Sequence, residues 1–176
     1  MFACNAAPCA DTAPPLLVLE ARLRVLGPDG ERDIPIDDYF AGPGETRLAR
    51  DEIVTSILLD PPCPSARSVF LKKKRVHMDL ALASVAVLVE MGGDGETCSK
   101  ARVAAGSVAP KPLRLHEVEG LLEGQRITEE ILTRAVDLAR EGVSPISDVR
   151  ASAEYRRHVT GVLLRRALQM SVTGAP

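Results

Sequence analysis

Residues 82–105 read LASVAVLVEMGGDGETCSKARVAA, and this stretch decides the fold. Two runs rich in valine and alanine, 82–90 and 97–105, flank the glycine-rich segment 92–95. Glycine tolerates the positive backbone angles that a hairpin loop needs, so the stretch predicts two antiparallel strands. Their apolar side chains are expected to give the C-terminal unit one apolar face and a core that needs nothing upstream.

Three helices are expected to follow the hairpin, at residues 115–122, 129–140 and 153–170. Thr128 and Ser152 are suited to cap the second and third of them. The third helix has the clearest period, and its core stripe is predicted as Tyr155, Val159, Val162, Leu163, Ala167 and Met170. The Tyr155 ring is expected to be buried with its hydroxyl bonded. The arginines are expected to point to water, namely Arg156, Arg157, Arg165 and Arg166.

The part of the chain upstream of the hairpin reads as a smaller mixed unit. Residues 12–19 predict a short helix begun by prolines, with Leu16, Leu17 and Leu19 in the core. Residues 22–26 and 32–36 alternate around dense turn chemistry and predict a β-hairpin with Ile34 and Ile36 on one face. Residues 52–59, rich in isoleucine, valine and threonine, predict a further strand.

A proline-rich segment at 61–67 is the expected boundary between two units, because its prolines resist both helix and sheet interiors. The predicted fold class is α+β. A partial subdomain at 1–62 is expected to precede a unit at 68–173, a small antiparallel sheet packed with helices on one side.

Composition excludes several function classes. The chain has 176 residues, a net charge of −2 and 3% aromatic residues, which disfavours a nucleic-acid partner. No apolar run reaches the length of a membrane span, and the start of the sequence lacks the features of a secretion signal. We therefore expect a cytoplasmic protein.

Self-contained catalysis is not indicated. The histidines, His77, His116 and His158, lack triad or metal-ligand spacing. Cys4 and Cys9 have the first gap of an iron–sulfur motif, but no third cysteine follows two residues later. All the cysteines are expected to be free thiols, mostly small buried side chains. We predict no catalytic residue and no metal ligand in this chain.

A longer motif at residues 5–14, NAAPCADTAP, is more informative. It resembles the Asn-Ala-Ser-Pro-x-x-Asp-x-x-Pro pattern of flavin domains in molybdenum hydroxylases. Further blocks agree in order and spacing with the same family, at 46–54, 70–81, 106–112 and 148–156. Across nearly its whole length the chain resembles the FAD-binding (medium) subunit of the xanthine dehydrogenase and aerobic carbon monoxide dehydrogenase family.

The resemblance implies an FAD-dependent oxidoreductase subunit. In the family, electrons leave a molybdenum cofactor, cross [2Fe–2S] clusters in partner subunits, and pass through FAD to NAD or a quinone-type acceptor. The cofactor-binding residues carried over are Asn5, Ala7, Pro8, Asp11, Leu48 and Lys72.

The carried-over residues have specific roles in the family and plainer alternatives. Asp11 would bond hydroxyls of FAD, Leu48 would lie against the isoalloxazine ring, and Lys72 would stand near the flavin. Asp11 as a turn or helix-capping residue, Leu48 as ordinary core and the basic run at 72–75 as a solvated edge are the plainer readings.

Departures from the family pattern limit what the chain is expected to do. Ala7 replaces the family serine, and residues 1–3 stand where Gly-Gly-Asn is usual. The glycine-rich FAD subdomain that cradles the pyrophosphate has no counterpart here. We expect a shortened subunit, arising from a split gene, an alternative start or a gene-model error. Alone it would be inactive and bind FAD weakly, unless a separate N-terminal flavin half joins it. The alternative is a non-redox docking or assembly module.

Overall fold

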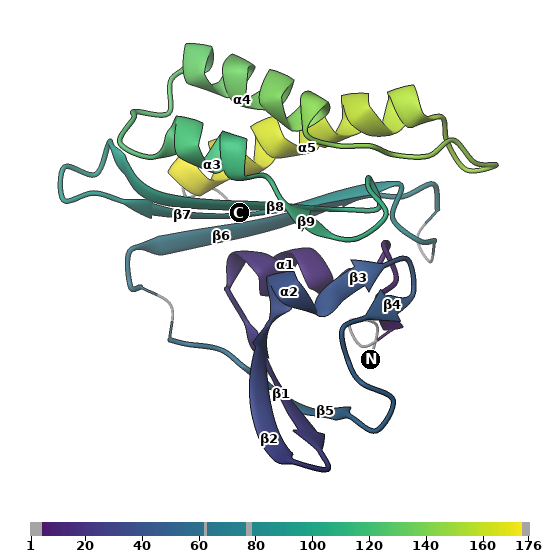
Figure 1. The fold of residues 1–176 in the computed structure, drawn as a ribbon. Coiled ribbons are helices and arrows are strands. Elements are labelled where there is room, and N and C mark those ends of the chain that lie inside the picture. Colours follow the sequence, from purple (N-terminus) through teal and green to yellow (C-terminus); the bar gives the residue numbers. More distant parts are fainter. Residues whose placement is uncertain (1–4, 62, 77–78, 174–176) are drawn as a thin grey trace.

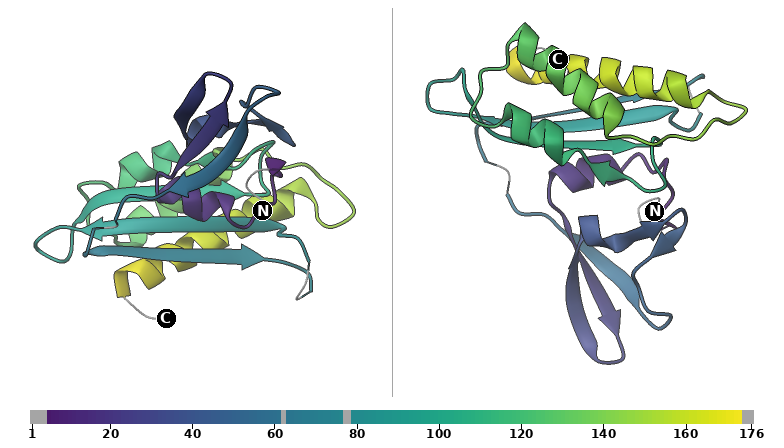
Figure 2. Two further views of the ribbon diagram at one scale, coloured as in Figure 1. Left: turned by 90° about the horizontal axis from the view of Figure 1, so that it is seen from below. Right: turned by 45° about the horizontal axis from the view of Figure 1, so that its top comes forward.

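A computed structural model describes residues 5–61, 63–76 and 79–173. The fold is α+β, as predicted. A four-stranded antiparallel sheet carries helices on one face, and a smaller mixed segment lies against its other face (Figures 1 and 2).

The larger sheet has the strand order β6-β7-β8-β9. Its central hairpin, β7 (Ala83–Met91) and β8 (Cys98–Gly106), confirms the prediction from residues 82–105, with Val87 opposite Val103. The strand β9 (Leu113–Arg114) extends it on one side. The edge strand β6 (Ala66–Lys73) was missed, because serine and lysine interrupt its apolar residues and prolines precede it.

The central hairpin is buried on both faces, which corrects the expectation of a single apolar face. Val85, Val87 and Val89 face the helices, whereas Ala86 and Leu88 belong to the core shared with the smaller segment. All of these side chains are at most 3% exposed. The face opposite α3, α4 and α5 packs against the upstream segment, so the expectation of a core that needs nothing upstream is wrong for that face.

The three predicted helices are present as α3 (His116–Leu122), α4 (Glu129–Glu141) and α5 (Ala153–Thr173). Both predicted caps are confirmed. The Ile131 amide donates to Thr128 Oγ1 at 3.4 Å, and the Tyr155 amide donates to Ser152 Oγ at 3.2 Å.

Helix α5 buries more of its circumference than its sequence period indicates. Val159, Leu163 and Ala167 are buried as predicted, but Tyr155 is 41% exposed and Arg156 only 4% exposed, so both of those expectations were wrong. Val162 and Met170 are half-buried. The helix packs on α4 as well as on β6 and β7. A second buried stripe therefore runs beside the first, formed by Arg156, Thr160, Leu164 and Leu168.

The smaller segment, residues 5–60, begins with α1 (Ala13–Val18) and the hairpin of β1 (Arg22–Gly27) and β2 (Gly30–Pro35). After these come α2 (Ile36–Tyr39), β3 (Phe40–Gly42), β4 (Glu45–Thr46) and β5 (Ile53–Leu58). Its three-stranded sheet has the order β2-β1-β5. The predicted helix, hairpin and strand are confirmed, but Ile36 starts α2 instead of continuing the strand.

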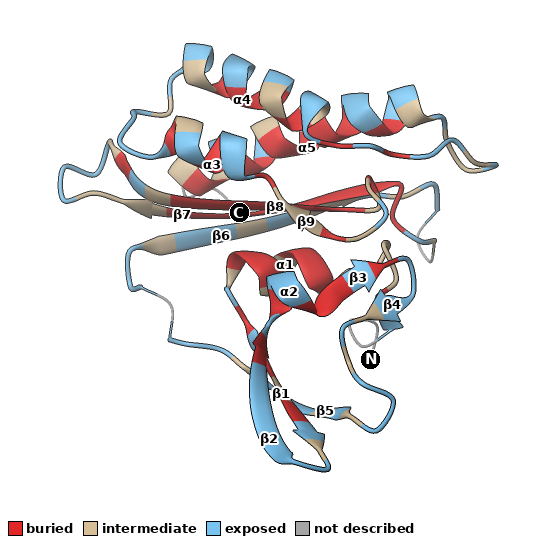
Figure 3. Ribbon diagram, in the orientation of Figure 1, coloured by how far each residue is buried: buried red, intermediate tan, exposed pale blue. Residues whose placement is uncertain are grey.

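The core of the smaller segment is continuous with the larger sheet. Leu17 is buried, Leu16 and Leu19 are partly buried, and α1 packs against β7 and β8 (Figure 3). Prolines at the first turn suit this short helix, because the amides there have no helical partner.

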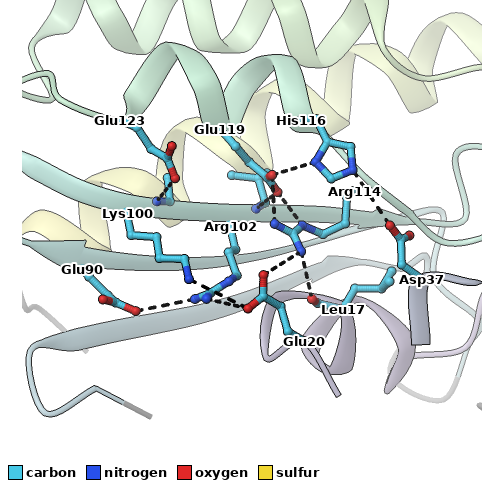
Figure 4. Close-up of polar contacts among 12 residues, drawn as sticks. Leu17, Glu20, Asp37, Glu90, Lys100, Arg102, Arg114, His116, Glu119 and Glu123 are labelled. Atoms are coloured by element: carbon cyan, nitrogen blue, oxygen red, sulfur yellow. Dashed lines mark hydrogen bonds and ion pairs between the residues drawn. The ribbon is translucent and has the colours of Figure 1, made fainter. Parts of the chain in front are cut away.

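A polar cluster, formed by Glu20, Arg102, Arg114 and Glu119, joins the segment to the sheet (Figure 4). Arg102 donates to Glu20 at 2.6 Å, and this hydrogen bond lowers the pKa of Glu20. Arg114 reaches Glu20 at 3.6 Å and donates to Glu119 at 2.5 Å. The buried Glu119 carboxylate also accepts from the Val103 amide at 2.8 Å, so the cluster continues from α1 through the sheet into α3.

Candidate flavin site

Two of the carried-over residues, Asp11 and Lys72, lie together although 61 positions separate them. Lys72 on β6 donates from Nζ to Asp11 Oδ2 in the turn before α1. The lysine side chain is 19% exposed and the aspartate side chain 46% exposed. The pairing was not predicted, because β6 itself was missed.

The second oxygen of the Asp11 carboxylate is buried. Among the described residues, Asp11 Oδ1 accepts no hydrogen bond. A carboxylate oxygen without a donor is costly, because buried polar groups in folded proteins are nearly always paired. The structure therefore leaves an acceptor beside a lysine, which suits a group that offers hydroxyl donors.

The turn that carries Asp11 is held by backbone contacts from distant elements. The Gly44 amide donates to Ala6 O at 3.0 Å, and the Ser107 amide donates to Pro8 O at 2.7 Å. Ala6 and Ser107 have positive φ angles of 47° and 66°, which residues with a Cβ rarely adopt. Both residues lie in the family blocks at 5–14 and 106–112, but their backbone conformation was not predicted, since a positive φ outside glycine leaves no signal in the composition.

Arg156 on α5 stabilises the position of Ser107, whose amide holds the turn that carries Asp11. Its guanidinium donates to Leu82 O at 2.7 Å, to Ser107 O at 3.4 Å and to Asp148 Oδ1 at 2.8 Å. Asp148 also accepts from the amides of Arg150 and Ala151, and those hydrogen bonds together with the arginine lower its pKa. The arginine therefore ties α5 to the segment that holds Pro8. A pocket of about 270 Å³ lies beside Pro8 and Arg156.

Of the other carried-over residues, Asn5 and Ala7 lie in the segment that leads to Asp11, whereas Leu48 lies elsewhere in the smaller segment. Asn5 is exposed, and Ala7 is half-buried with its carbonyl accepting from the Ala10 amide at 3.0 Å. Leu48 packs partly buried against the core of the smaller segment, and its amide donates to Thr46 Oγ1 at 3.4 Å.

The histidines lie in unlike surroundings, as their sequence contexts indicate. His116 contacts Glu119 at 2.9 Å, His158 is exposed, and His77 lies outside the described residues. Across the described part of the chain, no group of three or more metal-ligating side chains is present.

The cysteines are less uniformly buried than expected. Cys98 is buried, and burial raises the pKa of its thiol to about 11. Cys9 is half-buried and Cys63 is exposed, which corrects the expectation for Cys63. Cys4 lies outside the described residues.

A proline-containing turn with an aspartate–lysine pair lies against the edge of an antiparallel sheet whose far face carries helices.

Among residues 5–61, 63–76 and 79–173, no helix is long and apolar enough to cross a bilayer.

Two family models match the chain. The model of the FAD binding domain in molybdopterin dehydrogenase matches residues 3–61. The model of the CO dehydrogenase flavoprotein C-terminal domain matches residues 68–171.

Relatives and solved structures agree with these matches. The chain is 30% identical over 98% of its length to a putative xanthine dehydrogenase FAD-binding subunit, XdhB, of Escherichia coli. It is 34% identical over 95% of its length to the carbon monoxide dehydrogenase medium chain of Afipia carboxidovorans. A structure of carbon monoxide dehydrogenase from Hydrogenophaga pseudoflava, lacking the Mo-pyranopterin moiety, matches 97% of the chain and 58% of its own with a TM-score of 0.93 at 30% identity.

The chain belongs to the family of FAD-binding medium subunits of the xanthine and carbon monoxide dehydrogenases. Residues 3–61 match the FAD binding domain of that family. It spans 59% of XdhB and 57% of the Afipia medium chain.

Proposed function

We propose that this chain is an FAD-binding electron-transfer subunit of a cytoplasmic molybdenum hydroxylase. In this proposal bound FAD relays electrons from iron–sulfur clusters to NAD or a quinone-type acceptor. The partners are an iron–sulfur subunit and a molybdenum-cofactor subunit of the same complex. The observation that carries the proposal is the contact between Asp11 and Lys72, which brings two family flavin residues together.

The residues of this site would orient and hold the cofactor. Asp11 presents one carboxylate oxygen to Lys72 and a second without a described partner, so it fits the hydroxyls of a ribityl chain. Lys72 supplies a positive charge in a half-buried position, where an electrostatic interaction exceeds that at an open surface. Asn5, Ala7 and Pro8 would shape the turn, and Leu48 would pack against the ring.

For the phosphates of FAD, the described residues offer no site comparable to the Asp11–Lys72 pair. Within the described residues, no glycine-rich loop leads into a helix, and such loops are what offer amides to phosphates. We therefore propose that a flavin segment present in the relatives completes the site, either in the same polypeptide or as a separate half.

We further propose the two units 1–62 and 68–173. The linking residues around Cys63 are exposed, so limited proteolysis should cut there first and leave a resistant C-terminal fragment. Because Ala86 and Leu88 lose their cover in that fragment, it should unfold at a lower urea concentration than the full chain. Rapid cleavage within α5 would contradict the two-unit proposal.

An ultraviolet–visible spectrum of the purified chain, before and after adding FAD, tests the function. We expect weak or no binding by the chain alone, because the described residues offer no glycine-rich loop to the phosphates and each tenfold of affinity is about 1.4 kcal/mol. We expect binding once the complementary flavin segment is supplied. A chain that remains colourless with that segment would favour the alternative, a non-redox docking or assembly module.

The Asp11 assignment has its own test. In the completed protein, Asp11→Ala should weaken FAD binding by about 1.5 to 3 kcal/mol, the scale of a hydrogen bond to a charged group. Cys9→Ala, two residues away and half-buried, is the matched control and should leave the affinity nearly unchanged. Equal FAD affinity for the Asp11 variant and the wild type would remove Asp11 from the site.

A further inference from the structure

The pocket beside Pro8 and Arg156 has a volume of about 270 Å³ and is lined by both parts of the chain. Among the described residues that line it, Pro8 is the only one carried over from the flavin motif, whereas Asp11, Leu48 and Lys72 lie outside the lining. The pocket is therefore a different surface of the turn from the one that presents Asp11 to Lys72. Its walls are mostly apolar, formed by Pro8, Pro43, Ala81, Ala109, Pro110 and Ile146.

Two buried donors line this apolar pocket. Among the described residues, neither Arg156 Nε nor Ser107 Oγ has a hydrogen-bond partner, and the Arg156 side chain is only 5% exposed. The other guanidinium nitrogens of Arg156 already donate to Leu82, Ser107 and Asp148. Buried polar groups are nearly always paired, so the two donors suit a ligand that brings an acceptor into the pocket.

The charged side chains of the lining favour an anion. They are two arginines, Arg150 and Arg156, and one aspartate, Asp148, so the lining carries one net positive charge. Asp148 accepts hydrogen bonds from both arginines, which offsets its repulsion of a second anion. A carboxylate has an oxygen for Arg156 Nε and another for Ser107 Oγ, and hydrogen bonds between charged groups are the stronger ones.

The size and mouth of the pocket limit the rest of the ligand. Small-molecule sites in proteins are typically about 300 to 1,000 Å³, so this pocket fits a single ring or a short branched chain. Ile146 lies at the mouth and is 71% exposed, which leaves a path from solvent.

Two residues of the lining also hold the flavin turn. The Ser107 amide donates to Pro8 O at 2.7 Å, and the segment from Pro8 leads directly to Asp11. A ligand packed against both Pro8 and Ser107 restricts the motion of this turn. A second ligand that needs the turn ordered then loses less conformational entropy on binding.

We propose that this pocket binds a small apolar carboxylate and that the bound carboxylate tightens FAD binding through the Pro8 turn. The second part rests on the proposed function, whereas the first part does not.

Calorimetric titration of the full chain with benzoate tests the ligand class. We expect saturable binding with a Kd of about 1 mM or tighter, the scale for a ligand of this size. Acetate lacks the ring and benzamide lacks the charge, so both should bind at least about tenfold more weakly. No binding of benzoate, or equal binding of acetate or benzamide, would overturn the proposal.

Substitutions in the lining test the place of binding. Ser107→Ala removes one donor and should weaken benzoate binding by about threefold to tenfold. Ala109→Leu fills the pocket and should abolish binding. Ser68→Ala, exposed on β6 and outside the lining, is the control and should leave the affinity unchanged. Urea midpoints show whether each variant is folded. Folded Ser107 and Ala109 variants with wild-type affinity would overturn the pocket assignment.

An FAD titration of the completed protein, with and without saturating benzoate, tests the link to the flavin. We expect benzoate to tighten FAD binding by about twofold to fivefold, and FAD to tighten benzoate binding by the same factor. Unchanged FAD affinity would overturn the link, and weaker FAD binding would show that the two ligands share one pocket and overturn the proposal. A completed protein that binds benzoate but not FAD would count against the proposed function and the link, while leaving the pocket assignment standing.

Discussion

The two sheets of this protein differ in how completely they are covered. The larger sheet places α3, α4 and α5 on one face and α1 on the other, so its central strand β7 is buried over most of its length. The smaller sheet buries Leu23, Val25 and Ile34, but leaves β5 exposed. The difference teaches that the two sheets contribute unequally to the core, since the larger sheet is covered on both faces and the smaller sheet lacks part of its cover.

The largest expected effect comes from emptying the core of the larger region. Leu164 is fully buried in α5, so Leu164→Ala should lower the free energy of unfolding by about 2 to 5 kcal/mol. Leu26→Ala in the smaller sheet, where the side chain is 44% exposed, should cost less than about 1 kcal/mol. Urea unfolding measures both, and equal losses would erase the contrast between the regions.

A smaller effect is expected from the buried arginine of α5. Arg156→Met removes hydrogen bonds to Leu82, Ser107 and Asp148, and should cost about 1.5 to 3 kcal/mol, the scale of bonds to a charged group. Arg157→Met changes the exposed neighbour and is the control. Faster hydrogen exchange at the Ser107 amide should accompany only the Arg156 change. An unchanged urea midpoint would show that the arginine is dispensable.

The smallest effect concerns the polar cluster between the two regions. Because Arg102 lowers the folded-state pKa of Glu20 below its ordinary 4.5, the ionised carboxylate stabilises the folded state above that pH. The contribution is lost as pH falls through the folded pKa. Glu20 is half-exposed, so Glu20→Gln should cost less than about 1 kcal/mol at pH 7. Urea midpoints of variant and wild type should converge as the pH falls below the lowered pKa of Glu20, and a constant gap would contradict this origin.

Local patterns predicted most of the elements in both regions. The glycine-rich hairpin at 92–95, the caps Thr128 and Ser152, and the hairpin of β1 and β2 followed from local chemistry and are confirmed. These features depend on neighbours in sequence, which is why periodicity and turn residues suffice.

Features that depend on distant contacts could not be predicted in the same way. Arg156 was assigned to water because a charged side chain on an amphipathic helix usually faces it. Its burial is favourable because the carbonyls of Leu82 and Ser107 and the carboxylate of Asp148 accept its hydrogen bonds. The strand β6 was missed because its partner β7, not its own pattern, fixes it. Asp11 and Lys72 were each identified from a family motif, but their contact emerged only once β6 was placed.

The Arg156–Asp148 pair has a consequence for engineering the chain. The connection between α4 and α5 resembles a permissive surface loop, since Val149 is 98% exposed. Asp148 is nevertheless fixed by Arg156, Arg150 and two backbone amides, so a tag or a new terminus placed there would cut into the support of the Pro8 turn. The turn at 92–95 lies at the far end of the β7–β8 hairpin and bears none of these contacts, which makes it the better insertion point for a reporter.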